Sequence, residues 1–398
     1  MPSPEFTNSI VAGLEYWRER TRDMNDQVIA QIDGRRQNLF RAVHFGLELE
    51  TAWPVVAEVA LQTVPLVNRR MYRAEWIPVL EGLLARCPAE DRSLKFDLLI
   101  QLGRMQRLER QLEQATRTHQ AAEALARELG DEAALARAYY NLGRGYYDRH
   151  QYEEAERYCQ AALDILDDLE NADQSLIAWS LNTIGLAFGA QGDLDKAKYY
   201  LARNVAIMRT LDDPTGLVRA LIDQSHNLLL YDELDEAIAC LLEAEDLLTP
   251  TDNELDKTML GINLGSIYFR QGEWLLAEEA FRQSYSPYLR QSGNLHYQAY
   301  LATYLGNVLL KQERFVEAEA YMRQGVTLWR QMNDDLSLAN AVGSLGEVLV
   351  AQGDATAAIP LFDEALVLLE RFQEHSRAKG LQELFEDERK KAKEGLNE

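Results

Sequence analysis

The sequence predicts an all-α protein in which antiparallel helix pairs stack into one elongated α-solenoid. Seven alanines recur with gaps of 40, 42, 40, 40, 41 and 40 residues, and six of the seven residues that stand twelve positions before them are glycine. The alanines are Ala115, Ala155, Ala197, Ala237, Ala277, Ala318 and Ala358. The residues before them are Gly103, Gly143, Gly185, Ser225, Gly265, Gly306 and Gly346. A small residue at a fixed offset and period indicates one structural unit repeated along the chain.

Residues 1–49 are expected to form an N-terminal helical cap of two helices. Apolar residues recur at helical spacing around Leu14 and again over Val28–Leu47, where Asp33 and Gly34 form a weak point. Such a segment is expected to close the end of a stack, because a terminal unit lacks a neighbour on one side.

Residues 50–92 are expected to form a degenerate repeat with helices over residues 51–61 and 73–86. Counting back 40 residues from the first repeat alanine reaches Glu75. Pro78 predicts a kink or a helix end, because proline lacks the backbone N–H that a helix interior uses.

Residues 93–371 hold the seven regular repeats, and Ala138–Leu166 is the clearest of them. Apolar residues recur at helical spacing before and after a short break at Arg149–Gln151. Two helices joined by so short a connection pack antiparallel. We expect Gly143 and Ala155 to lie where the two helices approach most closely, since a larger side chain there would overpack the pair by about 1–3 kcal/mol.

Residues 372–398 are expected to form a capping helix followed by a charged, frayed tail. Leu381, Leu384 and Phe385 give this segment one short apolar stripe. The rest is strongly charged, which is typical of a solvated end.

The repeated unit resembles the tetratricopeptide repeat. The stretch YYNLGRGYYDRHQYEEAERYCQAAL has that family's spacing of aromatic, Leu-Gly, Tyr and Ala residues, and further copies include GINLGSIYFRQGEWLLAEEAF and ATYLGNVLLKQERFVEAEAYM. The resemblance implies a right-handed superhelix of helix pairs. The period of about 40 residues is longer than the usual 34. It is similar to the long-repeat branch found in kinesin light chains, bacterial peptide receptors and the sensor regions of STAND-type signalling ATPases.

A second resemblance lies at the start of the chain. The stretch GRRQNLFRAVHFGLELETAW is similar to the junction between the ATPase and the repeat sensor of STAND-type regulators. The phosphate-binding pattern GxxxxGK[ST] does not occur in this sequence. We therefore expect a sensor-like array without its ATPase.

Composition and motifs argue against several classes of protein. The net charge of −23 disfavours binding to nucleic acids or to anionic membranes. The chain has three widely spaced cysteines and no apolar stretch that could span a bilayer, so we expect a cytoplasmic protein. HExxH, CxxC and GxSxG are absent, and no histidine has metal-ligand spacing. We expect no enzymatic activity and no cofactor.

The tetratricopeptide resemblance also implies which residues face the inner, concave surface. It assigns five positions of each first helix to that surface, 35 in all, of which seven are basic and three acidic; the whole chain has 41 basic and 64 acidic residues. The resulting candidates for partner binding are Arg104, Arg107, Arg137, Tyr140, Arg144, Tyr147, Trp179, Asn182, Arg219, His226, Arg270, Tyr300, Asn307 and Lys311. The reversed charge predicts an acidic or carboxylate-bearing peptide as the ligand, because arginine forks and aromatic rings suit such binding. The alternative is that some of these arginines pair with acidic side chains of the protein itself.

Two functions follow from a binding groove without catalytic motifs. The first is a scaffold or adaptor that holds a protein partner in the groove. The second is a regulatory sensor whose superhelix changes shape around a peptide or another ligand and so controls a separate effector protein. Binding of single-stranded nucleic acid by the groove arginines and aromatics is a third, disfavoured by the acidic net charge.

Overall fold

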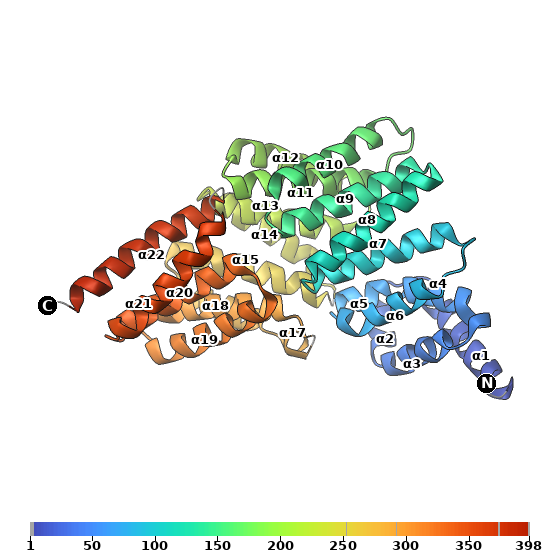
Figure 1. Ribbon diagram of the computed structural model, residues 1–398, viewed down its shortest axis with the longest axis horizontal. Coiled ribbons are helices and arrows are strands. Elements are labelled where there is room, and N and C mark those ends of the chain that lie inside the picture. The colour runs from blue at the N-terminus through green and yellow to red at the C-terminus, as the bar shows by residue number, and fades with distance from the viewer. Residues whose placement is uncertain (1–3, 252, 292, 373–374, 397–398) are drawn as a thin grey trace. The chain divides into compact units, whose positions relative to one another are not determined.

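A computed structural model describes residues 4–251, 253–291, 293–372 and 375–396, and all regular structure in these ranges is helical (Figure 1). It comprises 22 α-helices and two short 3₁₀ turns in these same ranges. The expected all-α class is therefore confirmed. The helices belong to two compact units, Met1–Ser180 with Leu248–Leu255, and Leu181–Leu247 with Asp256–Glu398. Each unit is described by itself below.

Six helices precede the regular repeats in the first unit. They are α1 (Pro4–Thr21), α2 (Asp26–Asp33), α3 (Arg36–Leu47), α4 (Trp53–Gln62), α5 (Val64–Arg69) and α6 (Arg73–Ala85). The expected weak point at Asp33-Gly34 separates α2 from α3, so residues 1–49 contain three helices rather than two. Leu14, Ile29 and Leu39 are fully buried where these helices pack.

Helix α6 buries the residue that follows Glu75. Glu75 is exposed, whereas Trp76 is fully buried and donates a hydrogen bond from Nε1 to the Ala60 carbonyl at 3.3 Å. We propose that Trp76 takes the place of the repeat alanine in an atypical repeat built from α4, α5 and α6. Helix α6 does not end at Pro78 but continues through it. Pro78 is exposed, so water can satisfy the carbonyl that loses its helical partner.

Seven helix pairs follow, each made of a first and a second helix. They are α7 (Arg92–Leu108) and α8 (Leu112–Leu129); α9 (Glu132–Asp148) and α10 (Tyr152–Asp167); α11 (Gln174–Gln191) and α12 (Leu194–Met208); α13 (Pro214–Leu230) and α14 (Leu234–Leu248); α15 (Glu254–Gln271) and α16 (Trp274–Ser284); α18 (Leu295–Lys311) and α19 (Phe315–Met332); α20 (Asp335–Ala351) and α21 (Ala355–Leu369). A short helix, α17 (Pro287–Gln291), follows α16. Within each unit, first helices also pack against the next first helix, as α7 does on α9 and α18 on α20 (Figure 1).

The repeat glycines are notches that receive a side chain from the second helix sixteen residues later. The pairs are Gly103 with His119, Gly143 with Cys159, Gly185 with Leu201, Gly265 with Phe281, Gly306 with Met322 and Gly346 with Phe362. A Cβ atom on Gly143 would clash with Cys159 Sγ and would lie 3.0 Å from the Ala155 carbonyl oxygen. The predicted close approach of Gly143 and Ala155 is confirmed.

The turn inside each pair also repeats. The residue five positions before each repeat alanine has a left-handed backbone: Arg110, His150, Gly192, Asp232, Gly272, Glu313 and Gly353. In the atypical repeat Met71 has the same conformation five residues before Trp76. This turn reverses the chain at the C-terminus of every first helix and so makes each pair antiparallel.

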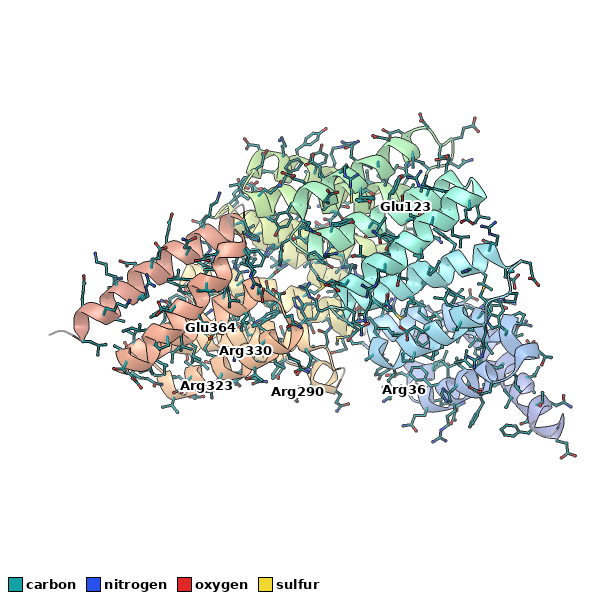
Figure 2. The ribbon with its side chains drawn as sticks, viewed as in Figure 1. Arg36, Glu123, Arg290, Arg323, Arg330 and Glu364 are labelled. Atoms are coloured by element: carbon teal, nitrogen blue, oxygen red, sulfur yellow. The ribbon has the colours of Figure 1, made fainter. Side chains whose placement is uncertain are left out.

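Ion pairs link successive second helices on their exposed side. Arg330 of α19 lies 2.6 Å from Glu364 of α21, and Figure 2 shows both side chains. Arg209, directly after α12, lies 2.7 Å from Glu243 of α14, with the same separation of 34 residues. Exposed pairs of this kind contribute about 0.2–1 kcal/mol each.

The C-terminal segment is helical over its described length. Helix α22 (Ser376–Gly395) packs on α20 and α21, and its charged residues are helical as far as Gly395. Phe385 is buried and Leu381 is partly buried against the core, but Leu384 is 41% exposed. Two of the three residues of the expected apolar stripe therefore lie against the core.

Candidate peptide-binding surface

In the first unit, charged pairs bring candidate residues of α7 and α9 onto one face. Arg137 of α9 pairs with Asp97 of α7, and its guanidinium lies 4.8 Å from the centre of the Phe96 ring. Arg107 Nη1 of α7 lies 2.5 Å from Asp148 Oδ2 of α9. Both pairs join residues about one repeat apart, so neighbouring first helices share this face.

The second of these pairs is the centre of a larger ionic cluster. Burial alone would raise the pKa of Asp148, but the cations of Arg107, Arg144 and Arg110 outweigh it and lower the pKa to about 2. Asp148 is therefore ionised at any physiological pH. The side chains of Arg107 and Asp148 are each 13% exposed, so this pair is mostly shielded from water.

Aromatic rings accompany the cations on the same helices. The Arg144 guanidinium lies 5.1 Å from the centre of the Tyr147 ring. The rings of Tyr140 on α9 and Trp179 on α11 lie 5.9 Å apart at an interplanar angle of 32°. The structure thus brings Tyr140 and Trp179 together at the point where two successive first helices meet.

Arg104 lies next to a buried imidazole. His119 fills the Gly103 notch and is fully buried. Burial and the cations of Arg107 and Arg104 together lower the pKa of His119 to about 3, although a hydrogen bond with the Ile100 backbone opposes them. His119 is therefore a neutral core side chain.

In the second unit, Asn182 is held by two polar neighbours. Its Nδ2 donates to Asp223 Oδ2 at 2.7 Å, and its Oδ1 accepts from Asn204 Nδ2 at 3.0 Å. Asn182 is 9% exposed. Because both ends of this amide are engaged, its position is fixed by the protein itself.

Two candidate arginines of the second unit are also engaged by neighbouring repeats. Arg219 Nε of α13 lies 3.1 Å from Asp256 Oδ1 of α15, and Asp256 is fully buried while the Arg219 side chain is 42% exposed. Arg270 donates from Nη2 to the Leu229 carbonyl at 3.2 Å. The expected alternative, pairing of groove arginines within the protein, therefore holds for Arg107, Arg137 and Arg219.

His226 and Tyr300 lie near the start of α22. Burial lowers the pKa of His226; Asp223 opposes this, and the cation of Arg377 adds to it. The Tyr300 ring lies 5.5 Å from Trp329, edge to face. Tyr300 and Arg377 line one small cavity of about 10 Å³ together with Thr303, Tyr304, Trp329, Ser337 and Asn340.

The last two candidates lie further along α18. Lys311 is exposed, and Asn307 is half-buried. Lys311 is close enough to Glu347 of α20 for its cation to lower the pKa of that carboxyl. Lys311 and Glu347 thus belong to adjacent repeats of the second unit.

Sequence reasoning missed the partners of the candidate arginines, although a signal existed. Opposite charges stand 40, 41 and 37 residues apart in Asp97 with Arg137, Arg107 with Asp148, and Arg219 with Asp256. The first two separations match the repeat period, and residues one period apart lie on neighbouring first helices. Searching for opposite charges at one period would have identified the first two pairs, whereas Arg219 and Asp256 stand slightly closer in sequence.

The repeat architecture agrees with known proteins. The family model of the tetratricopeptide repeat matches residues 134–210, 254–331 and 297–371. The chain is a tetratricopeptide repeat protein. It is 21% identical over 222 residues to regulatory protein RapG of Bacillus subtilis (strain 168), a match that covers 55% of this chain and 59% of RapG.

Solved structures resemble the fold. A Rap protein in complex with Competence and Sporulation Factor has a TM-score of 0.56 and 14% identity, covering 85% of this chain and 98% of that one. A STAND protein with a tetratricopeptide repeat sensor from Pyrococcus horikoshii has a TM-score of 0.51 and 15% identity, covering 92% of this chain and 56% of that one. At these identities the similarity concerns the fold.

Two further properties concern the described residues. They include no group of three or more His, Cys, Asp or Glu side chains that could hold a metal ion. None of the helices within the described ranges has the length and apolarity needed to cross a bilayer.

Proposed function

We propose that this tetratricopeptide repeat protein is a non-enzymatic, cytoplasmic regulator that binds an acidic peptide segment along its first helices and thereby controls a separate effector protein. The names of its relatives support the regulatory role, since RapG is a regulatory protein and a Rap protein of the same fold was solved with a bound factor. The peptide is proposed to use the inner positions of α7, α9 and α11, where guanidinium groups and aromatic rings alternate.

The observation that carries this proposal is the group formed by Arg137, Tyr140 and Trp179. Arg137 and its partner Asp97 are 41% and 42% exposed, so water screens their attraction. A carboxylate of an incoming peptide can therefore replace Asp97 as the partner of Arg137 at a small cost in free energy. The Arg107–Asp148 pair is far less exposed and is proposed to hold the surface in shape.

Charge-removing variants test the binding site. Arg137→Gln with Arg144→Gln removes two cations of the proposed surface, whereas Arg117→Gln with Arg157→Gln removes two cations from the second helices α8 and α10, where both are about two-thirds exposed. Calorimetry with an acidic peptide library is expected to show at least about tenfold weaker binding for the first variant only. Equal affinities of the two variants would remove these arginines from the site.

A rigid scaffold is the competing function, and small-angle scattering separates it from a regulator. A regulator is expected to change its radius of gyration when the bound peptide shifts its conformational equilibrium. A scaffold keeps its radius and co-purifies with its partner in fixed stoichiometry. An unchanged radius at saturating peptide would therefore favour the scaffold.

A further inference from the structure

Helix α22 covers inner-surface positions of the last repeats. Its Phe385 occupies a notch at Gly343 of α20, where an added Cβ would clash with the ring. Its first turn places Arg377 in one cavity with Tyr300 and Asn340. The same tetratricopeptide pattern assigns Gly343, Tyr300 and Asn340 to the inner surface of their repeats.

The notch at Gly343 is specific to the last repeat. The equivalent position holds Ile100, Tyr140, Asn182, Ile222, Ile262 or Thr303 in the six other pairs. A glycine inside a helix costs about 1 kcal/mol relative to alanine, so it indicates a packing requirement. Phe385 meets that requirement, and its ring also lies 6.1 Å from Phe362, which fills the neighbouring Gly346 notch.

Apart from Phe385, α22 buries mainly small side chains against the core, with Leu381 partly buried. Among the described residues of α22, the side chains that are buried against the core are those of Ala378, Phe385 and Ala392, which stand seven residues apart. Two of the three are alanines, which bury little apolar area. One ion pair joins α22 to α21, between Arg389 and Asp363 at 2.7 Å, and both of its side chains are at least one-third exposed.

An unfavourable charge also faces α22. Glu347 of α20 is half-buried, and burial together with the neighbouring Glu388 of α22 raises its pKa to about 7, while Lys311 opposes this. Deprotonation of Glu347 therefore places two carboxylates on opposite sides of the interface. The docking of α22 thus combines one specific anchor with weak or opposing contacts elsewhere.

We propose that the inner face of α18 and α20 is a helix-docking surface that α22 occupies in cis as a detachable self-ligand. Release of α22 uncovers the Gly343 notch and the Tyr300 and Asn340 positions. The competing partner is a helix that carries an aromatic residue eight positions after an arginine, as Phe385 follows Arg377. The inference builds on the proposed regulator by naming a surface that this release makes available.

Hydrogen exchange on the full-length chain tests the release. In the wild type, amides of α22 are expected to exchange at least about tenfold faster than those of α20 and α21, because a weakly docked helix opens by itself. Phe385→Ala should accelerate exchange in α22 alone, whereas Leu384→Ala, next to it but exposed, should change exchange by less than about twofold. Equal protection of α20, α21 and α22 in the wild type would overturn the proposal.

A labelled synthetic peptide of residues 376–395 tests the docking surface in trans. The full-length Phe385→Ala chain should bind this peptide at least about tenfold more tightly than the wild-type chain does, because its own α22 competes less well. Gly343→Ala also displaces α22, but it fills the notch and so should not gain affinity for the peptide. Equal binding by all three chains would refute a shared surface.

These results are independent of the acidic-peptide experiment. Loss of peptide affinity in the Arg137/Arg144 variant concerns α9 alone. A permanently docked α22 would leave that binding intact, and a releasable α22 would remain even if the acidic peptides failed to bind.

Discussion

Two glycines of α9 provide a sharp test of the notch packing. Gly143 faces α10, and a Cβ there would clash with Cys159 Sγ and approach the Ala155 carbonyl oxygen to 3.0 Å and the Cys159 backbone nitrogen to 3.2 Å. Gly145, two residues later in the same helix, has nothing within 4 Å of the same added atom. Gly143→Ala and Gly145→Ala therefore differ in packing but not in helix propensity.

The expected magnitudes have opposite signs. Alanine in place of a helical glycine stabilises a folded helix by up to about 1 kcal/mol, and this is the whole expected effect at Gly145. At Gly143 the same gain is opposed by overpacking of about 1–3 kcal/mol, and two of the close atoms are backbone atoms that cannot rotate away. Gly143→Ala should therefore be destabilised by up to about 2 kcal/mol, and the two variants should differ by about 1–3 kcal/mol.

Urea unfolding followed by circular dichroism measures this difference. Repeat arrays can unfold in parts, so hydrogen exchange of α9 and α10 should accompany the denaturation curves. The reasoning predicts a lower midpoint and faster local exchange for Gly143→Ala, with a higher midpoint for Gly145→Ala. If both variants were stabilised to the same extent, the close contact between α9 and α10 would be refuted.

Three further predictions concern buried charges. Because the pKa of His119 is lowered in the folded protein, the wild type should lose stability as the pH falls below about 6.5, by about 3 kcal/mol at pH 4. His119→Leu, which introduces the residue type that Leu201 places in the Gly185 notch, should remove this loss, and comparing the acid-unfolding curves of the two proteins checks it. Because the folded protein holds the Glu347 proton more tightly, the wild type should lose about 1–3 kcal/mol of stability as the pH rises from about 4.5 to 7, and Glu347→Gln should not. Thermal melts of both proteins at pH 5 and pH 8 measure this, and an equal pH dependence in the two would contradict it. Glu109→Gln should lower the free energy of unfolding by about 3 kcal/mol, because Arg73, 1% exposed and 2.8 Å from Glu109, would lose its carboxylate partner. Denaturation curves measure this loss, and the Arg73→Met/Glu109→Gln double variant should recover most of it.

The notches were predictable because their cause is local and repeated. Gly143 and Ala155 could be placed at a close contact from spacing alone, since a hairpin of two helices has few ways to pack. The same logic failed at the irregular ends. We propose that Trp76 takes the place of the repeat alanine, one residue after Glu75, and α6 continues through Pro78.

The candidate surface was harder to predict than the fold. The tetratricopeptide pattern placed Tyr140 and Trp179 on neighbouring first helices, and their rings do meet. It counted Arg107 and Arg137 as surplus cations, yet each has a carboxylate partner one repeat away. A charge count along a sequence sums residues, whereas electrostatic binding depends on which opposite charges lie within a few ångströms.

By itself, the sequence determined the helical class, the period of the repeat and the glycine notches, because each follows from spacing along a single helix or hairpin. The tertiary structure alone decided that Arg219 meets Asp256, that Asn182 is held by Asp223, and that Phe385 covers Gly343. These contacts join residues 37 to 42 positions apart. They depend on the rotation between successive helix pairs, and a small change in that rotation moves a side chain by more than the length of a hydrogen bond.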